Sequence, residues 1–349
     1  MINKINCNKL LLQIVFIGIM FGCKPSAEVY VCPPCDQLCD ELTFDKSGKC
    51  PHCGMHLVAG KPDDQAFQNL NNLVIKSGSG KFIVSSGKDS SKVIGVHYYQ
   101  PKNMSLQAPV TIVLPGAGRN AAAYRNAWIP SSDRQGNLVL ALEFHELFYP
   151  EFWNYNLAGM IKEVNVEEET FTIVSDSSNW LFGDIDKLFE QVKSLLSLTA
   201  ETYDIFGHSA GGQILHRMAI FYPENSANRI LAANSGWYTL PSDSVDFPYG
   251  LRNQNQSEET IDFSSKLIVM LGENDDASET RGHLRHTPET DAQGLHRLSR
   301  GIFFYNFTKR IAESTDLPFA WKLEVIPDVG HDYAAMSSAA ADLLYGSVE

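Results

Sequence analysis

One ten-residue stretch constrains the fold of this 349-residue chain more than any other part of it. Residues 203–212 have the sequence YDIFGHSAGG, an apolar run that leads into a Gly-x-Ser-x-Gly pattern. This order predicts a strand that turns sharply into a helix, with Ser209 presented at the turn. The flanking glycines suit such a turn because they carry no Cβ and let the two backbones approach. Chance alone places the pattern in roughly one chain in ten of this size, so the rest of the chain must supply its partners.

Predicted strands and helices alternate along the chain on both sides of this stretch. Alternating apolar and polar residues predict an antiparallel hairpin at residues 81–85 and 93–100. Continuous apolar runs predict buried strands at residues 110–114, 138–144, 203–208, 229–234, 267–271 and 321–326. Helical periodicity predicts helices at residues 120–128, 180–196, 210–222, 293–312 and 333–344. The sequence therefore predicts an α/β fold, with a mostly parallel central sheet and helices on both faces.

Two of these helices carry more specific expectations. The helix that begins near Asn120 should end before Pro130, because proline lacks the amide hydrogen that a helix interior needs. The helix after Ser209 should bury one apolar face and leave His216 on its exposed side.

Three side chains with complementary acid–base chemistry follow predicted strands. Ser209, Asp275 and His331 would all meet at the carboxyl edge of a parallel sheet. A serine hydroxyl is barely ionised at neutral pH, so His331 would accept its proton during nucleophilic attack. Asp275 would hold the other ring nitrogen, and Asp276 is the alternative acid. The amide of Ala210 would face the oxyanion that forms.

The chain order Ser209, Asp275, His331 resembles the catalytic triad of α/β-hydrolases. The resemblance covers roughly residues 73–349, and within the family it is strongest to exported esterases and polyester-depolymerase-like proteins. The loop PGAGRN at residues 115–120 is similar to the family's His-Gly-x-Gly-x-Asn loop, with proline in the histidine position. The resemblance implies that the amide of Ala117 is a second oxyanion donor and that catalysis needs no cofactor.

Aromatic residues near the predicted carboxyl edge are candidates for contact with a substrate. Trp237 and Tyr238 follow the strand at residues 229–234, where they would either line a pocket or simply pack. The aromatic-rich excursion at residues 144–178 would either form a rim over the site or pack back on the core.

The N-terminus has the features of a bacterial export signal. Lys4 and Lys9 precede an apolar run at residues 10–21 that is too short to span a bilayer. The run ends in IMFGC, which resembles a lipobox and implies cleavage after residue 22 and lipid attachment to Cys23. The expected location is the bacterial cell envelope, on a membrane surface that is either periplasmic or external. An ordinary signal peptide and an uncleaved anchor are the alternatives.

All seven cysteines lie before residue 54. Two Cys-x-x-Cys pairs, Cys32 with Cys35 and Cys50 with Cys53, could place four thiolates around zinc or another thiophilic metal. Cys39 could replace Cys35, and a pair of disulfides is the alternative in an exported protein. Residues 30–58 resemble the heavy-metal-binding module of metal-efflux and copper-handling proteins, whose second half matches GKCPHCGM at residues 48–55. In its first half, Cys35 stands where the module has histidine.

These features predict four segments: a signal peptide at residues 1–22, a cysteine module at 23–60, a linker at 61–72 and a hydrolase domain at 73–349. The net charge of −13 argues against nucleic acid as a partner, because phosphate binding needs clustered Lys and Arg. The predicted function is hydrolysis of small or polymeric carboxylic esters through an acyl-enzyme. The alternatives are a metal-binding lipoprotein whose larger domain is a non-catalytic scaffold, and a serine peptidase.

Overall fold

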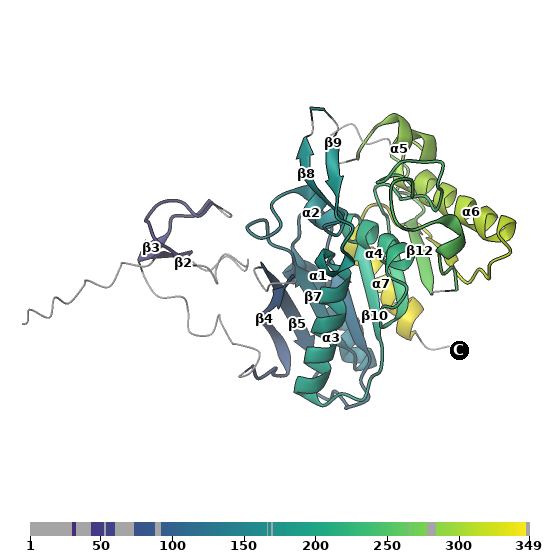
Figure 1. Cartoon of the computed structure of the whole chain (residues 1–349). Helices are drawn as coiled ribbons and strands as arrows, with labels where there is room; N and C mark the ends of the chain where they lie inside the picture. The colour runs from purple at the N-terminus through teal and green to yellow at the C-terminus, as the bar shows by residue number, and fades with distance from the viewer. Residues whose placement is uncertain are drawn as a thin grey trace, which may run out of the picture.

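The computed structural model describes residues 30–32, 43–51, 54–59, 73–87, 92–165, 167–168, 170–264, 266–277 and 284–346 (Figure 1). The predicted signal peptide, Cys23, Cys35, Cys39, Cys53 and the predicted linker at residues 61–72 all lie outside these ranges. Within the described ranges, no helix is both long enough and apolar enough to cross a membrane.

An eight-stranded sheet forms the centre of the large domain, with strand order β13-β12-β11-β10-β6-β7-β5-β4. The antiparallel hairpin of β4 (Gly78–Ser86) and β5 (Lys92–Gln100) lies at one edge, as predicted. The other strands run parallel: β6 (Val110–Leu114), β7 (Leu138–Glu143), β10 (Tyr203–His208), β11 (Ala227–Ala233), β12 (Leu267–Gly272) and β13 (Lys322–Ile326). The predicted α/β fold is confirmed.

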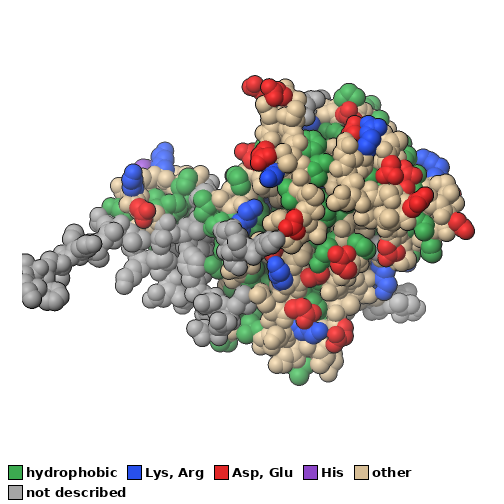
Figure 2. Space-filling model, viewed as in Figure 1, with side chains coloured by type: hydrophobic (Ala, Val, Ile, Leu, Met, Phe, Trp, Pro, Cys, Tyr) green, Lys and Arg blue, Asp and Glu red, His purple; other side chains and the backbone are tan. Residues whose placement is uncertain are grey.

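Helices cover both faces of this sheet because successive side chains of a buried strand point to opposite sides. One face packs against α1 (Ala121–Gln135) and α7 (Tyr333–Tyr345), with Val113 and Phe206 facing them. The other face packs against α3 (Phe182–Leu196), α4 (Ala210–Phe221) and α6 (Arg297–Ser314), with Ile112 and Ile205 on that side. Figure 2 shows that acidic and basic side chains are interspersed over one view of the surface.

The prediction that the first helix ends before Pro130 is wrong. Helix α1 continues through Pro130 to Gln135 and ends at Gly136, which adopts a left-handed conformation with φ 77°. Proline removes only the hydrogen bond to the carbonyl of residue 126, whereas Trp128 and Ser132 on the same helix are fully buried. Packing of these side chains therefore outweighs the local penalty.

The prediction that α4 leaves His216 exposed is also wrong, since every residue of this helix is buried. The short helix α2 (Phe152–Asn156) and the segment after β11 cover the side that periodicity assigned to water. His216 Nε2 accepts a hydrogen bond from the amide of Thr239 at 3.0 Å. Burial, with Arg217 as a second cause, holds the pKa of His216 well below its usual value.

Two other predicted segments differ in detail. The expected helix at residues 293–312 corresponds to α6, which begins only at Arg297. A separate short helix, α5 (Pro288–Gln293), precedes it and ends at Gly294, whose φ is 141°. The excursion at residues 144–178 contains α2, the hairpin of β8 (Ile161–Asn165) and β9 (Thr170–Ile173), and a 3₁₀ turn η3 (Ser177–Asn179). Tyr149 and Tyr155 of this excursion are fully buried, whereas Phe152 is 46% exposed.

The cysteine module has a small sheet of its own, formed by β1 (Tyr30–Val31), β2 (Thr43–Phe44) and β3 (Val58–Ala59). The amide of Cys50 donates to the carbonyl of Met55 at 2.7 Å, and the amide of Gly54 donates to the carbonyl of Cys50 at 2.9 Å. Cys32 and Cys50 are both buried and belong to one small cluster.

Candidate active site

Ser209 lies at the turn between β10 and α4, as predicted, and its backbone is strained. It has φ 56° and ψ −113°, a conformation that side-chain-bearing residues rarely adopt. The turn requires a residue without a Cβ at position 211, because a Cβ on Gly211 would lie 2.3 Å from the carbonyl oxygen of Leu114 in β6. A Cβ on Gly207 would meet the backbone of Gly211 at 2.5 Å. These close approaches hold Ser209 at the carboxyl edge of the sheet.

The structure brings Ser209, His331 and Asp275 into one hydrogen-bonded line. His331 Nε2 lies 3.2 Å from Ser209 Oγ, and His331 Nδ1 lies 2.8 Å from Asp275 Oδ2. The alternative acid Asp276 is exposed, and Asp332 instead caps α7 by accepting two backbone amides of its first turn. Asp275 is therefore the carboxylate that orients His331.

Two residues that the sequence analysis missed hold this line in place. Arg297, at the start of α6, lies 3.6 Å from the second carboxylate oxygen of Asp275, and both side chains are buried. Asn234, at the end of β11, accepts a hydrogen bond from the amide of Gly272 at 2.8 Å and donates one to the carbonyl of Gly330 at 3.1 Å. The asparagine thus joins the loop before Asp275 to the residue before His331. Its position as the last residue of a predicted strand was the sequence signal for it.

His208, the residue before the serine, packs beside His331. Its ring centroid lies 4.6 Å from that of His331, and its Nδ1 lies 3.0 Å from the hydroxyl of Tyr124. Burial, with smaller effects of His331 and Arg297, holds the pKa of His208 well below its usual value. A neutral His208 places no positive charge beside the ring of His331.

The glycine-rich loop after β6 lies against the nucleophile. A Cβ on Gly116 would be 3.4 Å from Ser209 Cβ, so this loop and the serine are in contact range. Ala210 is the first residue of α4, and its amide therefore has no acceptor within the helix. Ala117 is exposed on the loop. Ala210 therefore adjoins Ser209 in the chain, and Ala117 follows the glycine that lies against Ser209.

Trp237 and Tyr238 are buried beside the site rather than open to it. Trp237 packs on the guanidinium of Arg217 at 4.3 Å, and the ring of Tyr238 stacks on Phe304 at 4.5 Å. Gln293 bonds to both backbone groups of Tyr238, at 3.0 and 2.8 Å. Packing and support of the loop after β11 account for both positions.

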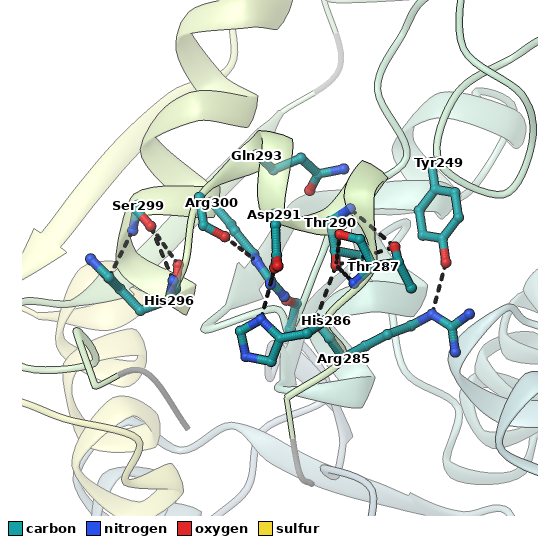
Figure 3. Close-up of polar contacts among 12 residues, drawn as sticks. Tyr249, Arg285, His286, Thr287, Thr290, Asp291, Gln293, His296, Ser299 and Arg300 are labelled. Atoms are coloured by element: carbon teal, nitrogen blue, oxygen red, sulfur yellow. Dashed lines mark hydrogen bonds and ion pairs between the residues drawn. The ribbon is translucent and has the colours of Figure 1, made fainter. Parts of the chain in front are cut away.

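The histidines near α5 also have structural roles. In Figure 3, His286 and Arg300 both point to Asp291, at 2.7 and 3.0 Å. Arg300 also donates to the carbonyl of Gly236 at 2.7 Å, and His296 caps α6 by accepting the amide of Ser299. This polar cluster therefore ties α5 and α6 to the loop after β11.

Three comparisons place the chain among known proteins. The heavy metal binding domain family matches residues 29–59. Poly(aspartic acid) hydrolase-1 from Sphingomonas sp. KT-1 is similar in structure, with 34% sequence identity, a TM-score of 0.71, 78% of this chain covered and 100% of that one. LpqC, a poly(3-hydroxybutyrate) depolymerase from Bordetella parapertussis, has 29% identity, a TM-score of 0.70, and 77% and 91% coverage. No curated protein matches the chain.

Proposed function

Because this chain belongs to the α/β-hydrolase family and is a serine hydrolase, we propose that it cleaves carboxylic esters through an acyl-enzyme on Ser209. The hydrogen-bonded line from Ser209 Oγ through both nitrogens of His331 to Asp275 carries this proposal. The line gives the serine proton an acceptor and gives the resulting imidazolium a buried carboxylate partner.

The proposed reaction has two steps, acylation of Ser209 and hydrolysis of the acyl-enzyme. Ser209 Oγ attacks the ester carbonyl while His331 Nε2 takes its proton, and the tetrahedral oxyanion receives hydrogen bonds from the amides of Ala117 and Ala210. The C–O bond to the alcohol then breaks, and His331 returns the proton to the departing oxygen. A water molecule attacks the acyl group in the same way, with His331 as base, and releases the carboxylic acid and free Ser209.

The proposed substrate class follows the chemistry of one of the two relatives. Their names specify hydrolysis of poly(aspartic acid), which is a polyamide, and of poly(3-hydroxybutyrate), which is a polyester. We therefore propose an ester of a carboxylic acid, either small or polymeric, as the substrate.

The test compares wild type with Ser209→Ala, using a fluorophosphonate probe and short-chain nitrophenyl esters. We expect probe labelling only in the wild type and a loss of hydrolysis of at least about 10⁴-fold in the variant. Ser244→Ala, which changes an exposed serine in another loop, is the matched control. Absence of labelling in the wild type would favour the non-catalytic scaffold, and faster turnover of peptide nitroanilides than of esters would favour a peptidase.

For the N-terminal module, we propose that Cys32, Cys35, Cys50 and Cys53 bind zinc or another thiophilic metal. The two described cysteines fit this role, because both are buried in one cluster and thiolates are soft ligands. Elemental analysis should find metal in the wild type and little in Cys50→Ser, with ester hydrolysis unchanged. A metal-free wild type whose cysteines are all oxidised would instead indicate disulfides.

We also propose that lipid on Cys23 holds the protein on a membrane of the bacterial cell envelope. The proposal depends on the apolar run and the IMFGC sequence that ends it. Cys23→Ser should move the protein from the detergent phase to the aqueous phase in a Triton X-114 partition. Equal partition of both forms would contradict lipid attachment.

A further inference from the structure

Two buried tyrosine hydroxyls contact the same peptide unit of the loop after β6. Tyr155 donates a hydrogen bond to the carbonyl oxygen of Pro115 at 2.6 Å. The amide of Gly116 donates to the hydroxyl oxygen of Tyr124 at 3.0 Å. These two backbone groups belong to one planar peptide and point in opposite directions. The peptide between Pro115 and Gly116 is therefore held at both of its polar ends.

The next peptide of the loop is held through its own carbonyl. The amide of Arg119 donates to the carbonyl oxygen of Gly116 at 2.9 Å, which closes a tight turn. That carbonyl shares a planar peptide with the amide of Ala117, so the Ala117 N–H must point away from the turn. Because the preceding peptide is fixed by the tyrosines, the direction of the Ala117 amide is set by two consecutive immobilised planes.

Each hydroxyl is fixed by surroundings that leave it little freedom. Tyr155 is fully buried between Phe144, whose ring centroid is 5.2 Å away, and the guanidinium of Arg119, also 5.2 Å from the Tyr155 ring. Tyr124 stacks on Tyr333 at 4.4 Å. Burial raises the pKa of both tyrosines, so both remain protonated and able to donate.

We propose that Tyr124 and Tyr155 are positioning residues that keep the oxyanion hole formed by clamping the peptide between Pro115 and Gly116. They act through the Ala117 amide and contact no substrate. Rotation of the clamped peptide would remove both hydrogen bonds and leave buried polar groups without partners. The inference rests on the proposed function, since it assigns the Ala117 amide to the oxyanion.

The clamp also gives the aromatic excursion a role in catalysis. Tyr155 comes from α2, and Arg119 of the loop donates hydrogen bonds to the carbonyls of Phe144, Tyr149 and Glu151 in the same excursion. Residues 144–156 therefore contact the loop after β6 and support it.

The test measures steady-state hydrolysis of a nitrophenyl ester by Tyr155→Phe and Tyr124→Phe. Complete loss of one oxyanion donor costs about 10²–10³-fold in kcat, so we expect these misalignments to lower kcat about 10- to 100-fold. KM should change less than about twofold, and affinity for a trifluoromethyl ketone that forms a tetrahedral oxyanion should fall by the same factor as kcat/KM.

Tyr98→Phe is the matched control. Tyr98 of β5 is also buried, and its hydroxyl also accepts a backbone amide, that of Lys76 at 3.2 Å, which lies outside the loop after β6. This variant should keep wild-type kcat. The pH profile of kcat/KM should also be unmoved in Tyr124→Phe, because a disturbed His331 would shift that profile whereas a misaligned amide would not.

The outcomes separate the clamp from the proposed function. An inactive wild type would defeat the proposed function and the clamp together. An active wild type in which Tyr124→Phe and Tyr155→Phe both match Tyr98→Phe in kcat and inhibitor affinity would overturn the clamp alone. If Tyr155→Phe fails to fold, Tyr124→Phe still decides, because it releases the other end of the same peptide.

Discussion

The acid of the site is a single carboxylate with two different partners. Asp275 is 4% exposed, with one oxygen at 2.8 Å from His331 Nδ1 and the other at 3.6 Å from Arg297. A buried carboxylate needs such partners, because an unpaired charge in the interior is costly. The pair of contacts keeps Asp275 aimed at one ring nitrogen and thereby leaves His331 Nε2 to face Ser209.

At this scale we predict the effect of Asp275→Asn. The amide occupies the same space but does not stabilise the imidazolium and favours the wrong tautomer of His331, so kcat should fall about 10³–10⁴-fold. Nitrophenyl ester kinetics measure the loss. Asp276→Asn should stay near wild type because that side chain is exposed. A larger loss for Asp276→Asn than for Asp275→Asn would reverse the assignment.

Among the secondary-structure elements, the strand–turn–helix of β10 and α4 does most to place the nucleophile. Its backbone passes so close to β6 and β11 that a Cβ on Gly211 or Gly212 would lie 2.3 or 2.7 Å from a carbonyl oxygen. Those oxygens belong to central strands and cannot move aside without breaking the sheet. The glycines of the pattern are therefore a packing requirement of the whole sheet.

The prediction for this element concerns Gly211→Ala. The added methyl overlaps the backbone of Leu114, so we expect a loss of about 3 kcal/mol or more in the free energy of unfolding. Urea denaturation followed by circular dichroism measures it. Gly118→Ala is the control, since the nearest atom to its Cβ would be 3.8 Å away. Equal stability of the two variants would show that the turn at Ser209 can rearrange to accept the added methyl group.

A second prediction at this scale concerns α1. Pro130 is exposed within the helix, so Pro130→Ala should restore a hydrogen bond to the carbonyl of residue 126 without altering the core. Alanine stabilises the helix by about 3 kcal/mol relative to proline, and the greater flexibility of the unfolded chain reduces this gain by about 1 kcal/mol. We expect a net stabilisation of about 1–2 kcal/mol in urea denaturation. A destabilised variant would mean that contacts of the proline ring stabilise the folded protein.

Among the residues that the structure describes, His208 and His216 are buried histidines whose pKa is lowered, and this links the stability of the molecule to pH. Burial holds both pKa values well below the usual 6.5, so below pH 6.5 the unfolded chain binds protons that the folded chain does not. The stability contributed by these residues is complete above pH 6.5 and is lost as the pH falls.

We therefore predict that the free energy of unfolding falls between pH 7.5 and pH 5.0 through these two residues. Urea denaturation at both pH values measures the difference. His216→Gln should make this fall smaller, whatever the variant's absolute stability. An unchanged difference would show that His216 does not contribute.

The sequence pattern was sufficient to predict an element wherever the structure of that element depends on residues within it. The apolar runs predicted the parallel strands, because a buried strand is apolar at consecutive positions. The Gly-x-Ser-x-Gly order predicted the turn at Ser209, because the turn requires glycine close to the serine in sequence. The positions of Asp275 and His331 after strands were enough to predict that they meet, since parallel strands end at one edge.

The supporting contacts of the site could not be predicted in this way. Arg297, Asn234 and the two clamping tyrosines act on groups that are distant in sequence, and no periodicity marks them. The burial of His216 and the passage of α1 through Pro130 likewise depend on neighbours that only the folded chain supplies. The sequence by itself determined the sheet, the turn and the order of the catalytic groups. Only the tertiary structure decided how those groups are held, because side-chain support depends on which surfaces the fold brings into contact.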